Sequence, residues 1–189
     1  MSLPLDVQLS LPSWVRDVVP AGVRTRGTES KMALAVRLAA ENVEREPGGG
    51  PFGAAVFRMD TGDLVSVGVN SVVRLRNSVF HAEVVALLLA HRELGVHKFG
   101  VDGAPPLELI TSCEPCAMCL GATHWSGVGR LVCGATKADA QALGFDEGPV
   151  NDSSYAHLRD RGVEVVRGVL RDEAVAVLKR YQDLGRPVY

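Results

Sequence analysis

The sequence H-A-E at residues 81–83, followed by P-C-A-M-C at residues 115–119, decides how this chain folds and what it can bind. An imidazole and two thiols can ligate zinc, and three protein ligands leave one tetrahedral position open, as catalytic zinc sites do. Glu83 lies two residues after the histidine, close enough to reach whatever fills that position. The two segments therefore predict one catalytic zinc ion per chain, bound by His81, Cys116 and Cys119.

Both halves of this motif lie at expected helix starts. Residues 82–94 are nearly all apolar, which predicts a helix packed against a sheet with little exposed face. Pro115 suits the opening of a second helix over 116–125, because its missing N–H is not needed there. A spacing of three residues places Cys116 and Cys119 on one helical face. The partial positive charge of a helix N-terminus favours their thiolate forms.

The predicted chemistry follows from the open zinc position. Zinc lowers the pKa of a bound water toward about 7. We expect Glu83 to take a proton from that water and return protons to a ring nitrogen and a departing amine. One carboxylate with both tasks fits a hydrolysis in which water replaces ammonia at a cyclic amidine carbon. Glu83 is therefore the predicted catalytic residue.

Three other hypotheses remain open at this point. Cys113, three residues before Cys116, could close the site as a fourth ligand and make the zinc purely structural. The chain could then be a non-catalytic, zinc-stabilised subunit, although such a site needs no proton shuttle at Glu83. The C-x2-C pair could instead form the reversible disulfide of an oxidoreductase, which His81 and Pro115 make less fitting.

Composition restricts the class of protein. A chain of 189 residues with 47% hydrophobic content suits a single domain. Twenty Lys and Arg oppose 22 Asp and Glu, which disfavours nucleic acid as a partner because such proteins carry a basic footprint. No apolar run reaches the roughly 18 residues of a membrane span, and the N-terminus does not resemble a signal peptide. We expect a cytoplasmic protein without a membrane partner.

Hydrophobic periodicity predicts an α/β protein with a five-stranded mixed sheet covered by helices. Strands are expected at residues 52–57, 64–69, 107–111, 130–133 and 163–166, and helices at 32–43, 82–94, 116–125, 137–142 and 172–180. About 29 residues with helical pattern separate the last two strands, which favours a parallel crossover between them. Residues 1–28 read as an extended arm with a short helix from Ser13, and residues 29–189 as the zinc-binding domain.

The chain resembles the cytidine deaminase superfamily, in its branch of guanine and tRNA-adenosine deaminases. The likeness rests on G-P-F-G-A at 50–54, Asn70, H-A-E-V at 81–84 and T-S-C-E-P-C-A-M-C-L-G-A at 111–122. This resemblance implies a three-layer α-β-α fold and zinc-dependent hydrolytic deamination by residues 29–189. The H-x-E and P-C-x-x-C pair is the signature of zinc-dependent nucleobase deaminases.

Two further segments resemble guanine deaminases and the related plant guanosine deaminases. A-L-G-F-D-E at 142–147 is similar to their Gly-Phe-Asp-Asp element, and Tyr189 to their C-terminal aromatic tail. In those enzymes the tail lies over the active site of a domain-swapped dimer, which implies a homodimer here. The resemblance further implies that the substrate contacts include Asn70 as a hydrogen-bonding group, Asp146 as a reader of the purine edge, Trp125 and Phe145 as apolar walls, and Tyr189.

The segment before the zinc histidine departs from that family pattern. Related purine deaminases usually have Asp-Pro-Thr-Ala where this chain has Asn-Ser-Val-Phe at 77–80. We expect the bulky Phe80 to change the pocket floor or close one side of it. Arg74 and Arg76 form either a solvated loop or a contact with a ribose, phosphate or acidic group.

The sequence therefore predicts hydrolytic deamination of a purine base or nucleoside, with guanine to xanthine as the leading hypothesis. A tRNA adenosine deaminase is the nearest alternative. Guanosine, cytosine or a triazine are alternative small substrates.

Overall fold

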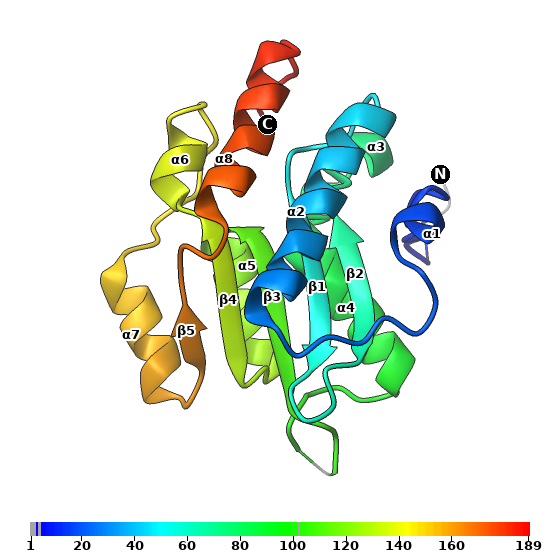
Figure 1. Cartoon of the computed structure of the whole chain (residues 1–189), viewed down its shortest axis with the longest axis vertical. Helices are drawn as coiled ribbons and strands as arrows, with labels where there is room; N and C mark the ends of the chain where they lie inside the picture. Colours follow the sequence, from blue (N-terminus) through cyan, green and yellow to red (C-terminus); the bar gives the residue numbers. More distant parts are fainter. Residues whose placement is uncertain (1–2, 4, 102) are drawn as a thin grey trace.

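A five-stranded mixed sheet forms the centre of the computed structural model, which describes residues 3, 5–101 and 103–189 (Figure 1). The strands are β1 (Gly53–Arg58), β2 (Leu64–Val69), β3 (Leu107–Cys113), β4 (Arg130–Ala135) and β5 (Glu164–Val166), in the spatial order β2-β1-β3-β4-β5. β1 is antiparallel to both β2 and β3, whereas β3–β4 and β4–β5 are parallel. The predicted parallel crossover between the last two strands is therefore confirmed.

Helices cover both faces of this sheet and complete a three-layer α-β-α arrangement (Figure 1). They are α1 (Val15–Val18), α2 (Thr28–Arg45), α3 (Val72–Leu75), α4 (Ala82–Leu94), α5 (Ala117–Ser126), α6 (Lys137–Gln141), α7 (Asp152–Asp160) and α8 (Arg171–Asp183). α2 and α8 lie in front of the sheet in this view, and α4 and α5 lie behind it. The predicted fold class is confirmed. None of the helices in the described part of the chain is long and apolar enough to cross a membrane.

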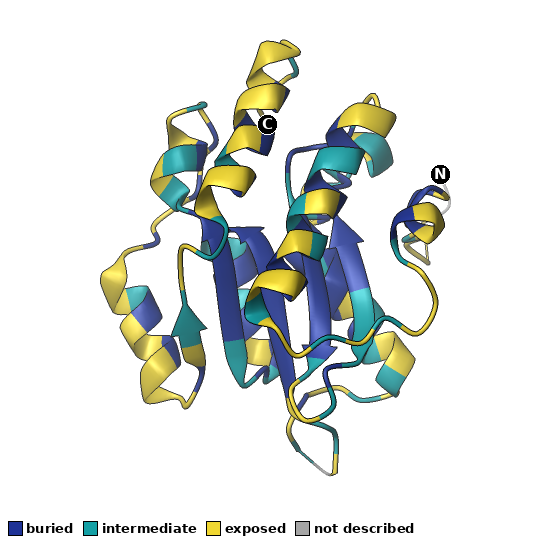
Figure 2. Ribbon diagram, viewed as in Figure 1, coloured by how far each residue is buried: buried dark blue, intermediate teal, exposed yellow. Residues whose placement is uncertain are grey.

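Alternation along the strands divides the core between the two faces. In β1, Ala54 and Val56 belong to the cluster that contains the buried residues of α4, whereas Ala55 and Phe57 belong to the cluster that contains those of α2. Both faces of the central strands are covered, so their residues are almost all buried (Figure 2). This explains why the sequence shows continuous apolar runs rather than a polar alternation.

Two helices were not predicted, and one predicted helix has an exposed leucine. α3 has a single turn, which gives no measurable period. α7 buries only Tyr155 and Leu158, and its N-cap Asn151 accepts hydrogen bonds from the backbone of residues 153 and 154. α4 packs against the sheet as expected, except that Leu88 is 46% exposed.

The N-terminal arm packs against α2. Trp14, Val15 and Val18 are buried in the same cluster as α2, which places the short helix α1 on the body of the protein. The indole of Trp14 donates a 3.0 Å hydrogen bond to Glu46. The arm and the domain therefore share one core.

Charged side chains are buried between α2 and the sheet. Lys31 and Glu108 form an ion pair in which both side chains are nearly inaccessible to solvent. Arg130 binds the other oxygen of Glu108 at 3.0 Å. Because two cations share this one carboxylate, its removal leaves charge without compensation in the core.

We predict that Glu108→Ala lowers the free energy of unfolding by about 3–5 kcal/mol, the usual effect of breaking a buried ion pair. Glu44→Ala is the matched control, because it removes an exposed ion pair with Arg180 and should cost about 0–1 kcal/mol. Equilibrium urea denaturation measures both values. Equal decreases in the free energy of unfolding for the two variants would show that the buried ion pair contributes no more to stability than the exposed one.

Candidate active site

The candidate site lies at one edge of the sheet, where several loops meet. β2, β3 and β4 run in one direction and β1 in the other, so the start of β1 and the ends of the others share this edge. Phe52 precedes β1, Asn70 follows β2 and Glu114 follows β3. The N-termini of α4 and α5 point to the same region, with His81 and Cys116 as their N-cap residues.

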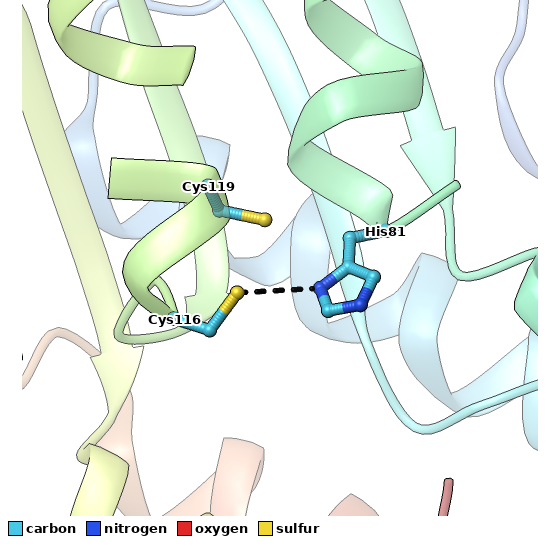
Figure 3. Close-up of side chains that lie close together, drawn as sticks. All are labelled: His81, Cys116 and Cys119. Carbon is cyan, nitrogen blue, oxygen red and sulfur yellow. Dashed lines mark hydrogen bonds between the residues drawn. The ribbon is translucent and has the colours of Figure 1, made fainter. Parts of the chain in front are cut away.

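His81, Cys116 and Cys119 converge from these two helix starts (Figure 3). Their ligand atoms all lie within 4.8 Å of one another, and Sγ of Cys116 is 3.5 Å from Nδ1 of His81. Two ligands bound at 2.0–2.3 Å to a tetrahedral zinc ion lie roughly 3.5 Å apart, so the three side chains fit this ion. In the described ranges, no other group of three or more His, Cys, Asp and Glu is placed to hold a metal.

Cys113 lies outside this group. It ends β3, is buried, and its sulfur lies 3.6 Å from the carbonyl oxygen of Thr136. That placement does not support a closed site with Cys113 as the fourth ligand.

The groups around Cys116 favour its thiolate form, which is the form that binds metal. Its pKa is lowered to about 4, chiefly because the thiol of Cys119 lies against its sulfur and His81 lies beside it. The pKa of Cys119 is raised by the neighbouring Cys116 and by burial. Only thiolates ligate zinc, so Cys119 must lose its proton for the ion to bind.

Glu83 lies beside the three ligands in the first turn of α4. It is 6% exposed, and its Oε2 lies 3.4 Å from Sγ of Cys119, which donates to it. Burial raises the pKa of Glu83, because the charged form is poorly solvated there. A carboxylate whose pKa is raised in this way takes up a proton more readily than a solvated one, as a general acid and base requires.

A cavity opens directly onto these residues. Its volume is about 30 Å³, enough to admit water. The lining consists of Phe52, Asn70, His81, Glu83, Glu114, Cys116, Phe145, Asp146, Glu147 and Tyr189. The structure thus brings the expected contacts Asn70, Phe145, Asp146 and Tyr189 together beside the metal ligands.

Phe80 and Trp125 do not line this cavity. Trp125 is 76% exposed. It lies six residues after Cys119, a rotation of about 240° that carries it to the other side of α5. Phe80 is buried, but it precedes an extended residue, His81, and neighbouring side chains of extended chain point in opposite directions.

Three lining residues were not among the expected contacts. Phe52 packs edge-on against Phe145 with ring centroids 5.0 Å apart. Glu114 is held by the backbone N–H of Lys137 and by the guanidinium of Arg167. Glu147 is the last acid of the Gly-Phe-Asp-Glu element, which was the available signal for it. Burial raises the pKa of Glu147 to about 8.

The C-terminal tail covers the cavity of its own chain. Arg186 donates hydrogen bonds to the carbonyl oxygens of Val43, Glu46 and Pro47 at the end of α2. Tyr181 donates to the carbonyl of Pro187 at 2.7 Å. These bonds bring the ring of Tyr189 to 5.7 Å from that of Phe145, centroid to centroid.

The open zinc-ligand set, the buried glutamate and the three-layer fold together define a zinc-dependent hydrolytic deaminase. Comparison with known families agrees: the model of the cytidine and deoxycytidylate deaminase zinc-binding region matches residues 26–135, and the chain belongs to this family.

Guanine deaminases are prominent among its relatives. The guanine deaminase of Bacillus subtilis (strain 168) is 37% identical over 119 residues, 63% of this chain and 71% of that protein. The structure of guanine deaminase from Nitrosomonas europaea matches with a TM-score of 0.90 and 40% identity, covering 97% of this chain and 100% of that one.

Other similar proteins bear on the substrate. A structure with 8-azaguanine bound matches with a TM-score of 0.90 and 40% identity, again over 97% of this chain and 100% of that one. Curated tRNA-specific adenosine deaminases also match, at 23–29% identity.

We predict that Cys116→Ser or Cys119→Ser lowers the zinc content of the purified protein from about one ion per chain to near zero, because each removes one of only three protein ligands. Cys113→Ala is the control and should retain the ion. Metal analysis by mass spectrometry gives the stoichiometry. Loss of zinc from the Cys113→Ala variant would show instead that Cys113 is a fourth ligand and that the zinc site is closed and structural.

Proposed function

We propose that this chain converts guanine to xanthine by zinc-dependent hydrolysis. The observation that carries this proposal is the composition of the cavity, which combines a recognition amide, aromatic rings and three buried acids beside the metal ligands. The guanine deaminase relatives, one of which aligns over nearly its whole length, support the same substrate.

The cavity walls suit a flat, polar heterocycle. Phe52, Phe145 and Tyr189 provide aromatic surface, and such rings prefer the stacked and edge contacts that a purine can make. Asn70 is 1% exposed, and its Oδ1 lies 3.3 Å from the backbone N of Val72. Its Nδ2 forms no hydrogen bond with any residue that the structure describes, so this donor is available to a purine acceptor.

Asp146 stands at the rim of the cavity and complements that donor. Its Oδ1 accepts a hydrogen bond from the backbone N–H of Gly148 at 2.9 Å, which fixes the carboxylate. The other oxygen is left to accept N–H groups from the edge of the base. Guanine presents such donors at its ring and exocyclic nitrogens, so Asp146 and Asn70 together would read its polar edge.

We assign the proton transfers of the reaction to Glu83 and Glu147. A zinc ion held by His81, Cys116 and Cys119 would supply a water of lowered pKa. Glu83 accepts a proton from the attacking water and passes it to the ring nitrogen beside the reacting carbon. The water oxygen forms a C–O bond to the reacting carbon. Glu83 then carries the remaining hydroxyl proton to the exocyclic amine, the C–N bond breaks as the C=O forms, and ammonia leaves. Glu147, whose pKa burial raises to about 8, is a second acid that can donate a proton to the substrate.

We predict that zinc-loaded protein releases ammonia from guanine and that Glu83→Gln lowers the rate by at least about 10²–10⁴-fold, because the proton shuttle is lost. The variant should retain its zinc and its melting temperature. The same assay should include guanosine, adenosine, cytosine, a triazine and an anticodon stem-loop. Activity on the stem-loop alone would favour the tRNA-adenosine alternative, and activity that survives Glu83→Gln would contradict the assigned mechanism.

We further propose that the protein is a homodimer joined through α4 and α5. Val84, Leu88, Ala122 and Trp125 line an open apolar groove of about 230 Å³ there, and a tryptophan that is 76% exposed favours burial. Leu88→Asp should therefore shift the protein from dimer to monomer in sedimentation equilibrium. A wild type that is monomeric at every concentration would contradict this arrangement.

A further inference from the structure

Asn42 is a buried polar residue on α2 that the chemistry described above does not use. It is fully buried, and its Nδ2 donates two hydrogen bonds, each of 2.9 Å, to the carbonyl oxygens of Gly50 and Asn70. Its Oδ1 has no hydrogen-bond partner in the described part of the chain. Only the donor half of this amide is used, and leaving an acceptor unpaired in the core is unfavourable. The residue is therefore placed for its two donated bonds.

These two bonds join two neighbouring segments at the edge of the sheet where the cavity lies. Gly50 belongs to the loop before β1, and Asn70 is the first residue after β2. Asn42 holds Asn70 by its backbone carbonyl, while the backbone N of Val72 holds the side-chain oxygen of Asn70. Together these contacts fix both ends of Asn70 and direct its free Nδ2.

The glycine loop at residues 49 and 50 is in close contact with Asn42, Asn70 and Tyr189. A Cβ atom on Gly50 would collide with the hydroxyl of Tyr189 and would lie 2.9 Å from Cγ of Asn70. A Cβ atom on Gly49 would collide with the backbone of Asn42 and would lie 2.9 Å from its Cγ. The glycine loop is thus held between Asn42 on one side and the recognition groups on the other. A shift of Asn42 would be passed directly to Asn70 and Tyr189.

We propose that Asn42 is a positioning residue for substrate recognition, which acts through Asn70 to set the affinity for the purine base. This inference rests on the proposed function, because it assumes that Asn70 binds the base. It assigns Asn42 a role that its side chain performs without touching the substrate.

The test is a double-mutant cycle on the affinity for 8-azaguanine, measured by calorimetry with zinc-loaded protein. Asn42→Ala should weaken binding about tenfold, the usual effect of losing a buried hydrogen bond. In an Asn70→Ala background the same change should weaken binding less than about twofold, because the group that it positions is gone. With guanine as substrate, Asn42→Ala should raise KM and change kcat little.

Two further variants separate positioning from general damage. Asn42→Asp keeps the shape but turns carboxylate oxygens toward two carbonyls, so it should also weaken binding at least tenfold and serves if the alanine variant does not fold. Leu38→Ala, on the same helix but in a cluster without cavity residues, should lower the melting temperature and leave the affinity unchanged.

The possible results distinguish failure of this inference from failure of the proposed function. Unchanged affinity in both Asn42 variants, or equal weakening with and without Asn70, overturns the inference alone. A wild type that binds 8-azaguanine but does not deaminate guanine overturns the proposed reaction while the cycle still tests Asn42. A wild type that binds no purine overturns both.

Discussion

The convergence of two helix N-termini at one edge of the sheet is the constraint on which the site depends. His81 and Cys116 are 35 residues apart in the sequence, yet the sheet order and the parallel β3–β4 pair place the starts of α4 and α5 side by side. A shared metal ion would join these two helices directly. The packing of α4 and α5 on the same face of the sheet is therefore as much a part of the metal site as the ligands themselves.

Burial gives the acids of this site their properties. Glu83 and Glu147 both lie in the cavity at about 6% exposure, and both have raised pKa values. Negative charges that share a poorly solvated space repel one another, which favours the protonated forms of these two carboxyl groups. The same enclosure strengthens every hydrogen bond that a substrate makes there, because water competes less. The three aromatic rings of the cavity therefore have two effects. They shape the cavity, and by excluding water they help to raise the pKa values of the acids that transfer protons.

Sequence patterns predicted the features that depend on local periodicity and spacing. The five strands and the helices α2, α4, α5, α6 and α8 followed from apolar runs, and the metal group followed from residue type and interval. Side-chain direction was harder to predict, because the turn of α5 and the extended chain before α4 carry Trp125 and Phe80 away from the cavity. Asn42 had no local signal at all. The role that we propose for it arises from contacts with Gly50 and Asn70, which only the folded chain brings to it.

The C-terminal tail lies over the cavity, so its position governs access to the groups below it. If the tail must move before a base can enter, binding occurs only during the fraction of time that the tail is displaced. The apparent dissociation constant then equals the intrinsic one divided by that fraction. A tightly held tail protects the reacting groups from bulk water but slows both the entry of base and the escape of product. The turnover rate would then reflect how often Arg186 releases the end of α2, as well as the chemistry that Glu83 performs.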